Sequence, residues 1–118
     1  MRVLASASVR DVEGMRDMEL TISRRDESGT ALLTLVGSID LISRQDLITA
    51  GKDALGEGDA LSLDMLGVDF MDSMGIGALI ELARHAEGLG QPFAITEKSP
   101  RVRRVLQATG LDDAWQPA

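Results

Sequence analysis

Four stretches of the chain carry the apolar patterning that is typical of β-strands: residues 19–22, 31–36, 60–66 and 92–96. The first two flank a polar turn at residues 24–30, so we expect them to form a hairpin. Gly37 is expected to end the second strand, and residues 67–72 are predicted to form a loop after the third.

Three further stretches have helical spacing. Ser43 and Asp46 have the Ser-x-x-acid spacing of a capping box, which predicts a helix over residues 44–55. A second helix is predicted from Met74, because apolar residues recur at 76, 79, 80 and 83. Ser99 followed by Pro100 predicts the start of a third. The order β-β-α-β-α-β-α indicates an α/β fold, with a mixed sheet of four or five strands and helices packed over it.

Residues 1–17 have mixed charge and no sustained hydrophobic period, so we expect a flexible N-terminal extension there. Residues 18–118 are then expected to form one domain, which is long enough to bury a core.

The amino-acid composition excludes several classes of function. Twelve basic and 19 acidic residues give a net charge of −7, which argues against nucleic acid as a partner. The chain has no cysteine and no apolar run long enough to span a bilayer, so we expect a cytoplasmic protein without membrane insertion. The acidic residues lack the spacing of a metal loop, and we expect neither a metal nor a cofactor.

Basic residues cluster once, at Lys98, Arg101, Arg103 and Arg104. A solvated helix face is the favoured interpretation of this cluster, and a contact for an acidic partner is the alternative.

Ser73 stands where the third strand gives way to the second helix, within the run Asp-Phe-Met-Asp-Ser-Met-Gly-Ile-Gly of residues 69–77. A hydroxyl at a helix N-terminus is exposed and lies near unpaired N–H groups, a position that tolerates a phosphate. The alternative is that Ser73 only caps the helix. Gly75 and Gly77 in the first turn indicate that something approaches the backbone closely.

A catalytic role for Ser73 is not supported. The sequence around it lacks the first glycine of a nucleophile elbow. The single histidine, His85, is twelve residues further along the same predicted helix, about 18 Å away at 1.5 Å per residue. We therefore expect no catalytic residues and no enzymatic activity.

Three blocks in the right order resemble the STAS family (sulfate transporter and anti-sigma factor antagonist). Residues 72–77 are similar to its Asp-Ser-(Ser/Thr)-Gly-(Leu/Ile)-Gly signature. Residues 36–40 resemble its second strand exit, and residues 99–111 resemble its last helix. The resemblance extends over residues 18–115, and the chain departs from the signature at Met74, where the family has Ser or Thr.

The resemblance implies that Ser73 is phosphorylated by a partner kinase, itself an anti-sigma factor, using ATP. It also implies that Asp40, Asp72 and Gly75 shape the site. Candidate partner contacts are apolar residues around that site: Leu41, Ile42, Met71, Met74 and Ile76.

The predicted function is that of an anti-sigma factor antagonist. Unphosphorylated, it would bind the anti-sigma kinase and release a sigma factor, and phosphorylation of Ser73 would switch it off. A phosphatase is a further conceivable partner. Two alternatives stay open: a non-switching STAS accessory subunit of a transporter or other assembly, and a STAS module that binds a small nucleotide or lipid.

Overall fold

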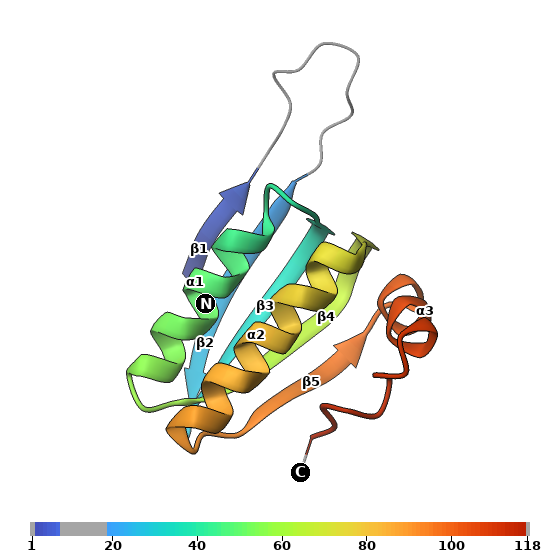
Figure 1. Cartoon of the computed structure of the whole chain (residues 1–118). Helices are drawn as coiled ribbons and strands as arrows, with labels where there is room; N and C mark the ends of the chain where they lie inside the picture. The colour runs from blue at the N-terminus through green and yellow to red at the C-terminus, as the bar shows by residue number, and fades with distance from the viewer. Residues whose placement is uncertain (1, 8–18, 118) are drawn as a thin grey trace.

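The computed structural model describes residues 2–7 and 19–117, which form one mixed sheet with three helices (Figure 1). The five strands lie side by side in chain order: β1 (Arg2–Ala7), β2 (Leu20–Glu27), β3 (Thr30–Ile39), β4 (Ala60–Met71) and β5 (Phe93–Lys98). The pairs β1–β2 and β2–β3 are antiparallel, and the pairs β3–β4 and β4–β5 are parallel. The predicted mixed α/β sheet is thus confirmed.

The helices are α1 (Arg44–Gly56), α2 (Ser73–Leu89) and α3 (Pro100–Ala108). Figure 1 shows α1 and α2 side by side over one face of the sheet, with α3 beside β5. As the sequence predicted, Ser99 caps α3, because its hydroxyl accepts a hydrogen bond from the N–H of Val102 at 3.1 Å. None of the helices in the described residues is long and apolar enough to cross a membrane.

The core lies between the sheet and the pair α1 and α2. Alternate residues of each inner strand face it and are almost fully buried, as their period of two requires. The largest of these side chains are Leu20, Ile22, Leu33, Leu35, Leu61, Leu63 and Met65. Burying each such side chain is worth roughly 1.5–3 kcal/mol, so this face fixes the strand register.

Two of the predicted strands run further than their hydrophobic pattern indicates. β3 continues through Gly37 to Ile39, and β4 covers the predicted loop at residues 67–72 as far as Met71. Both predictions were wrong because parallel β3–β4 pairing supplies hydrogen bonds that a local pattern does not reveal. Gly37 has a φ of +115°, and a Cβ there would collide with the backbone of Glu19.

The N-terminal residues differ in part from the expected flexible extension. Arg2–Ala7 forms β1, an edge strand that pairs antiparallel with β2. The backbone groups along the edge of β2 supply its partners, and these do not depend on a hydrophobic period. Met1 and residues 8–18, the remainder of the expected extension, lie outside the described residues.

Ion pairs connect elements away from the core. Arg24 is 4 % exposed and bonds Glu57 at 2.8 Å, Asp26 at 2.8 Å and Asp59 at 3.2 Å. The hydrogen bond to Glu57 is the main reason that the pKa of Arg24 lies above its ordinary value, with burial opposing it. These contacts tie β2 to the turn before β4, at the end of the sheet opposite Ser73.

Candidate functional site

The site lies at the carboxyl ends of β3 and β4, where both strands lead into helices. Ile39 and Met71, the last residues of the two strands, are paired in the sheet. Asp40 and Asp72 come directly after them, so the loops that begin α1 and α2 are neighbours. Loops at this edge of a parallel sheet commonly form binding sites.

Asp72 caps α2. Its Oδ1 accepts a hydrogen bond from the N–H of Met74 at 2.9 Å, and its carbonyl accepts one from the N–H of Gly75 at 3.0 Å. Ser73 is therefore the first residue inside the helix. The alternative in which Ser73 serves as the cap is wrong, because the aspartate before it takes that role.

The Ser73 hydroxyl is left available for chemistry. Its side chain is exposed and makes no hydrogen bond to any of the residues that the structure describes. It stands at the N-terminus of a helix of 17 residues, where the dipole stabilises negative charge by about 0.3–1 kcal/mol. A phosphate on this oxygen would therefore be tolerated.

Gly75 sets the depth at which α2 begins. A Cβ at this position would collide with Cγ of the buried Met71 and would come within 3.1 Å of Cγ2 of Ile39. Glycine lets the first turn of α2 rest on the ends of β3 and β4. The predicted close approach to the backbone at Gly75 is thus confirmed, whereas a Cβ on Gly77 would come no nearer than 3.8 Å to a neighbour.

Asp40 orders its own loop. It is 8 % exposed, and its Oδ1 accepts hydrogen bonds from the N–H groups of Ile42 and Ser43, each at 3.0 Å. Ser43 occupies the cap position of α1, but its hydroxyl donates to the carbonyl of Ser38 at 2.8 Å and caps nothing. The predicted capping box is therefore wrong, since the strand end competes for the hydroxyl.

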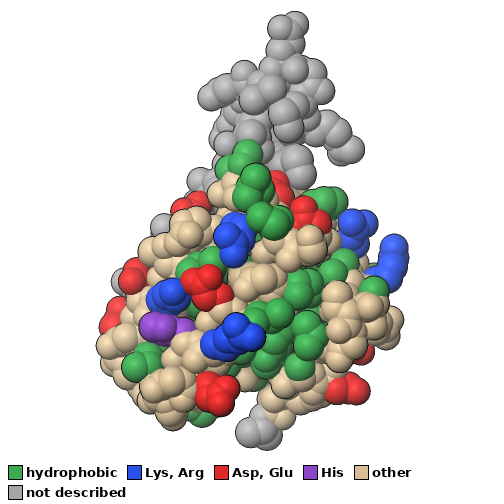
Figure 2. Space-filling view, in the orientation of Figure 1, with side chains coloured by type: hydrophobic (Ala, Val, Ile, Leu, Met, Phe, Trp, Pro, Cys, Tyr) green, Lys and Arg blue, Asp and Glu red, His purple; other side chains and the backbone are tan. Residues whose placement is uncertain are grey.

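This ordered loop displays two large apolar side chains. Leu41 is 65 % and Ile42 is 50 % exposed, and Met74 across the site is 37 % exposed. Figure 2 shows hydrophobic and acidic side chains mixed at this upper end of the described residues. The other two predicted contacts, Met71 and Ile76, are only 0 % and 7 % exposed and belong to the core.

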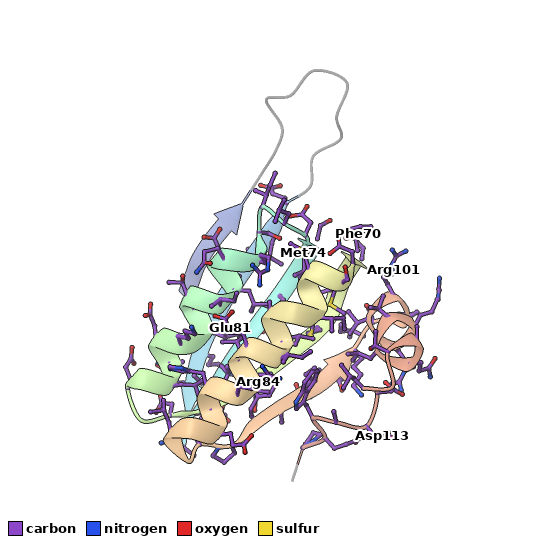
Figure 3. All side chains as sticks on the ribbon, in the orientation of Figure 1. Phe70, Met74, Glu81, Arg84, Arg101 and Asp113 are labelled. Atoms are coloured by element: carbon purple, nitrogen blue, oxygen red, sulfur yellow. The ribbon has the colours of Figure 1, made fainter. Side chains whose placement is uncertain are left out.

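A hydrogen bond connects the two loops. Nε of Arg44, the first residue of α1, donates to the carbonyl of Met74 at 3.4 Å (Met74 is labelled in Figure 3). Further along the same helix pair, Lys52 lies 2.8 Å from Glu81, and this hydrogen bond lowers the pKa of Glu81. The starts of α1 and α2 are thus held together.

A pocket of about 410 Å³ opens between the start of α2 and α3. Asp72 and Ser73 line one side, and Arg101 and Arg104 of α3 line the other. From the sequence, a solvated helix face was the favoured interpretation of these arginines and an acidic partner the alternative, and nothing connected them with Ser73. Their i, i+3 spacing puts them on one side of α3, but only the tertiary fold shows that this side borders a pocket shared with the start of α2.

The arrangement offers an exposed hydroxyl with no histidine near it. Among residues 2–7 and 19–117, no three His, Cys, Asp or Glu side chains come together in a way that could hold a metal ion. His85 lies in the fourth turn of α2, far along the helix from Ser73. The geometry therefore suits a hydroxyl that receives a group from another molecule.

Comparison with known proteins identifies the family. The family model described as Mlab, STAS domain, matches residues 22–116. The chain is 31 % identical over 100 residues to the anti-sigma-F factor antagonist RsfB of Mycobacterium tuberculosis, covering 82 % of this chain and 80 % of that one. The chain belongs to the STAS family.

Solved structures agree with this assignment. An anti-sigma factor antagonist from Mycobacterium paratuberculosis matches with a TM-score of 0.70 and 28 % identity, over 84 % of this chain and 86 % of that one. The anti-sigma factor antagonist SpoIIAA in its unphosphorylated form matches with a TM-score of 0.70, over 81 % of this chain and 85 % of that one. At 23 % identity it supports the fold alone. The phosphorylated form of Bacillus SpoIIAA matches with a TM-score of 0.65 and 22 % identity, over 81 % of this chain and 88 % of that one.

The cap can be tested by a pair of substitutions at adjacent positions. Asp72→Ala should lower the free energy of unfolding by about 1 kcal/mol, because the N–H of Met74 loses its acceptor. Ser73→Ala should change it by less than about 0.5 kcal/mol, because this hydroxyl bonds nothing in the described structure. Urea denaturation measures both, and a larger loss for Ser73→Ala would show that the serine is the cap.

A second pair of substitutions tests the close approach at Gly75. Gly75→Ala should lower the free energy of unfolding by about 1–3 kcal/mol through overpacking against Met71. Gly88→Ala, in the last turns of the same helix, meets no atom within 4 Å and should be neutral or stabilise by up to about 1 kcal/mol. Equal effects of the two substitutions in thermal or urea unfolding would contradict this packing.

Proposed function

We propose that this chain is an anti-sigma factor antagonist whose partner is an anti-sigma factor with serine kinase activity. The observation that carries the proposal is the exposed Ser73 hydroxyl at the start of α2, which makes no hydrogen bond to any described residue because Asp72 caps the helix. Membership of the STAS family and relatives named as anti-sigma factor antagonists support the same role.

In the proposed reaction the chain is a substrate and not a catalyst. The kinase transfers the γ-phosphoryl group of ATP to Oγ of Ser73, so that the bond to ADP breaks and a serine phosphoester forms. The hydroxyl proton passes to a base of the kinase. The phosphorylated form of the structural relative SpoIIAA is a precedent for phosphorylation within this fold.

The unphosphorylated chain would bind the kinase through the apolar rim formed by Leu41, Ile42 and Met74. These side chains are exposed, Leu41 and Ile42 on the loop before α1 and Met74 in the first turn of α2, where a partner can bury them. A phosphate would add about −1.5 to −2 charges next to Asp72. Removing that charge from water would oppose burial of the rim, so the kinase would dissociate and again bind its sigma factor in the cytoplasm. A phosphatase would reverse the change.

A second candidate function rests on the same rim. Leu41 and Ile42 are exposed enough to hold a partner permanently, and Met74 replaces the second hydroxyl of the family signature. A STAS accessory subunit of a transporter or other assembly would use this surface without any phosphorylation of Ser73.

Phosphate mapping separates the two functions. The purified chain is incubated with ATP and with each candidate anti-sigma kinase from its own genome, and mass spectrometry locates the phosphate. The expected result is one phosphate on Ser73 and none on the Ser73→Ala variant. A stable complex without phosphorylation would support the accessory subunit, and phosphate on another residue would contradict the assignment of Ser73.

A further inference from the structure

The basic cluster at the start of α3 divides into two pairs. Lys98 and Arg103 both contact Asp112, at 3.2 Å and 3.5 Å. Arg101 and Arg104 make no ion pair with any residue that the structure describes, and both line the pocket that Ser73 borders. Two arginines thus line one pocket without an ion-pair partner among the described residues.

Arg101 is held in place although it has no anionic partner. Its Cζ lies 4.9 Å from the centre of the Phe70 ring, a cation–π contact that orients the guanidinium plane. Its Nε is buried and bonds no described residue. Figure 3 shows Arg101 and Phe70 close together at the end of β4, near the start of α2 marked by Met74. The guanidinium therefore carries its positive charge without an ion-pair partner among the described residues, which suits it to a phosphate.

The composition of the pocket favours a phosphoryl group attached to the protein. Its lining is mainly apolar and includes Ile76 and Val105. Asp72 is the acidic side chain of this lining and would repel an anion that arrives from solution. A phosphate bonded to Ser73 needs no such encounter, because the covalent bond holds it beside the arginines.

We propose that Arg101 and Arg104 bind the phosphoryl group of phosphorylated Ser73 within this pocket. The inference rests on the proposed function, since a kinase must supply the phosphate. Arginine is the side chain best matched to phosphate oxygens, and paired arginines commonly order a phosphorylated segment. Phosphorylation would then join α2 to α3 and cover the apolar pocket, in addition to placing charge beside the rim of Leu41 and Ile42.

The test places phosphoserine at position 73 of the full chain during translation and follows the phosphate by ³¹P NMR as pH is varied. The second pKa of a phosphoserine is ordinarily near 6, and a bound guanidinium lowers it. Arg101→Gln and Arg104→Gln should each raise this pKa above that of the parent, by roughly half a unit or more, because one cation is removed. The helix dipole and Asp72 are unchanged in every sample.

Arg84→Gln is the matched control, because it removes one positive charge from an exposed position on α2 that does not line the pocket (Arg84 is labelled in Figure 3). In this variant, the second pKa of the phosphoserine at position 73 should equal that of the parent. If the Arg101 and Arg104 variants also titrate like the parent while their thermal melting is unchanged, the proposal is wrong. The phosphate is installed without a kinase, so the failure of every kinase to modify Ser73 would contradict the proposed function and leave this result standing.

Discussion

The site depends on one hydrogen bond, from the N–H of Met74 to the carboxylate of Asp72. The bond ends β4 and begins α2, and it satisfies a backbone donor that every helix start leaves unpaired. Because the aspartate fills this role, the adjacent Ser73 needs no local partner. Its hydroxyl stays exposed at the positive end of the helix, where a transferred phosphate would be stabilised. Asp72 thus stabilises the start of the helix, while the neighbouring Ser73 stays available for chemistry.

The rest of the site follows from the parallel pairing of β3 with β4. Pairing of Ile39 with Met71 brings two loops together that are about 30 residues apart in the chain. Asp40 folds one of them so that Leu41 and Ile42 project outward, while Gly75 lets α2 rest directly on the strand ends. A phosphate on Ser73 would consequently stand beside an apolar rim. The proposed partner surface and the group proposed to control it thus lie at the same edge of the sheet.

The sequence was sufficient where a signal is local. Hydrophobic alternation located β2–β5 approximately, and Ser99 before Pro100 located the start of α3, since its cap uses a neighbouring N–H. The end of β4 could not be predicted, because its last residues are strand only through pairing with β3. The β1 edge strand could not be predicted either, because its hydrogen bonds come from β2.

The candidate site, too, could be predicted from the sequence only in part. Ser73 and Gly75 were recognisable from a short motif, whereas the choice of cap was not, because Asp and Ser are both good cap residues and stood next to each other. Met71 and Ile76 were expected as partner contacts but are core, since burial depends on how α2 rests on the sheet. Arg101 and Arg104 line the pocket beside Ser73 only because the fold brings α3 against β4, which no local pattern indicates.

The most direct test compares the affinity of the anti-sigma kinase for two forms of the full chain, one with Ser73 and one with phosphoserine at position 73. Calorimetric titration gives both dissociation constants. The account predicts that phosphorylation weakens binding at least tenfold, a free-energy difference of about 1.4 kcal/mol or more. Equal dissociation constants would contradict the claim that phosphate on Ser73 controls the partner.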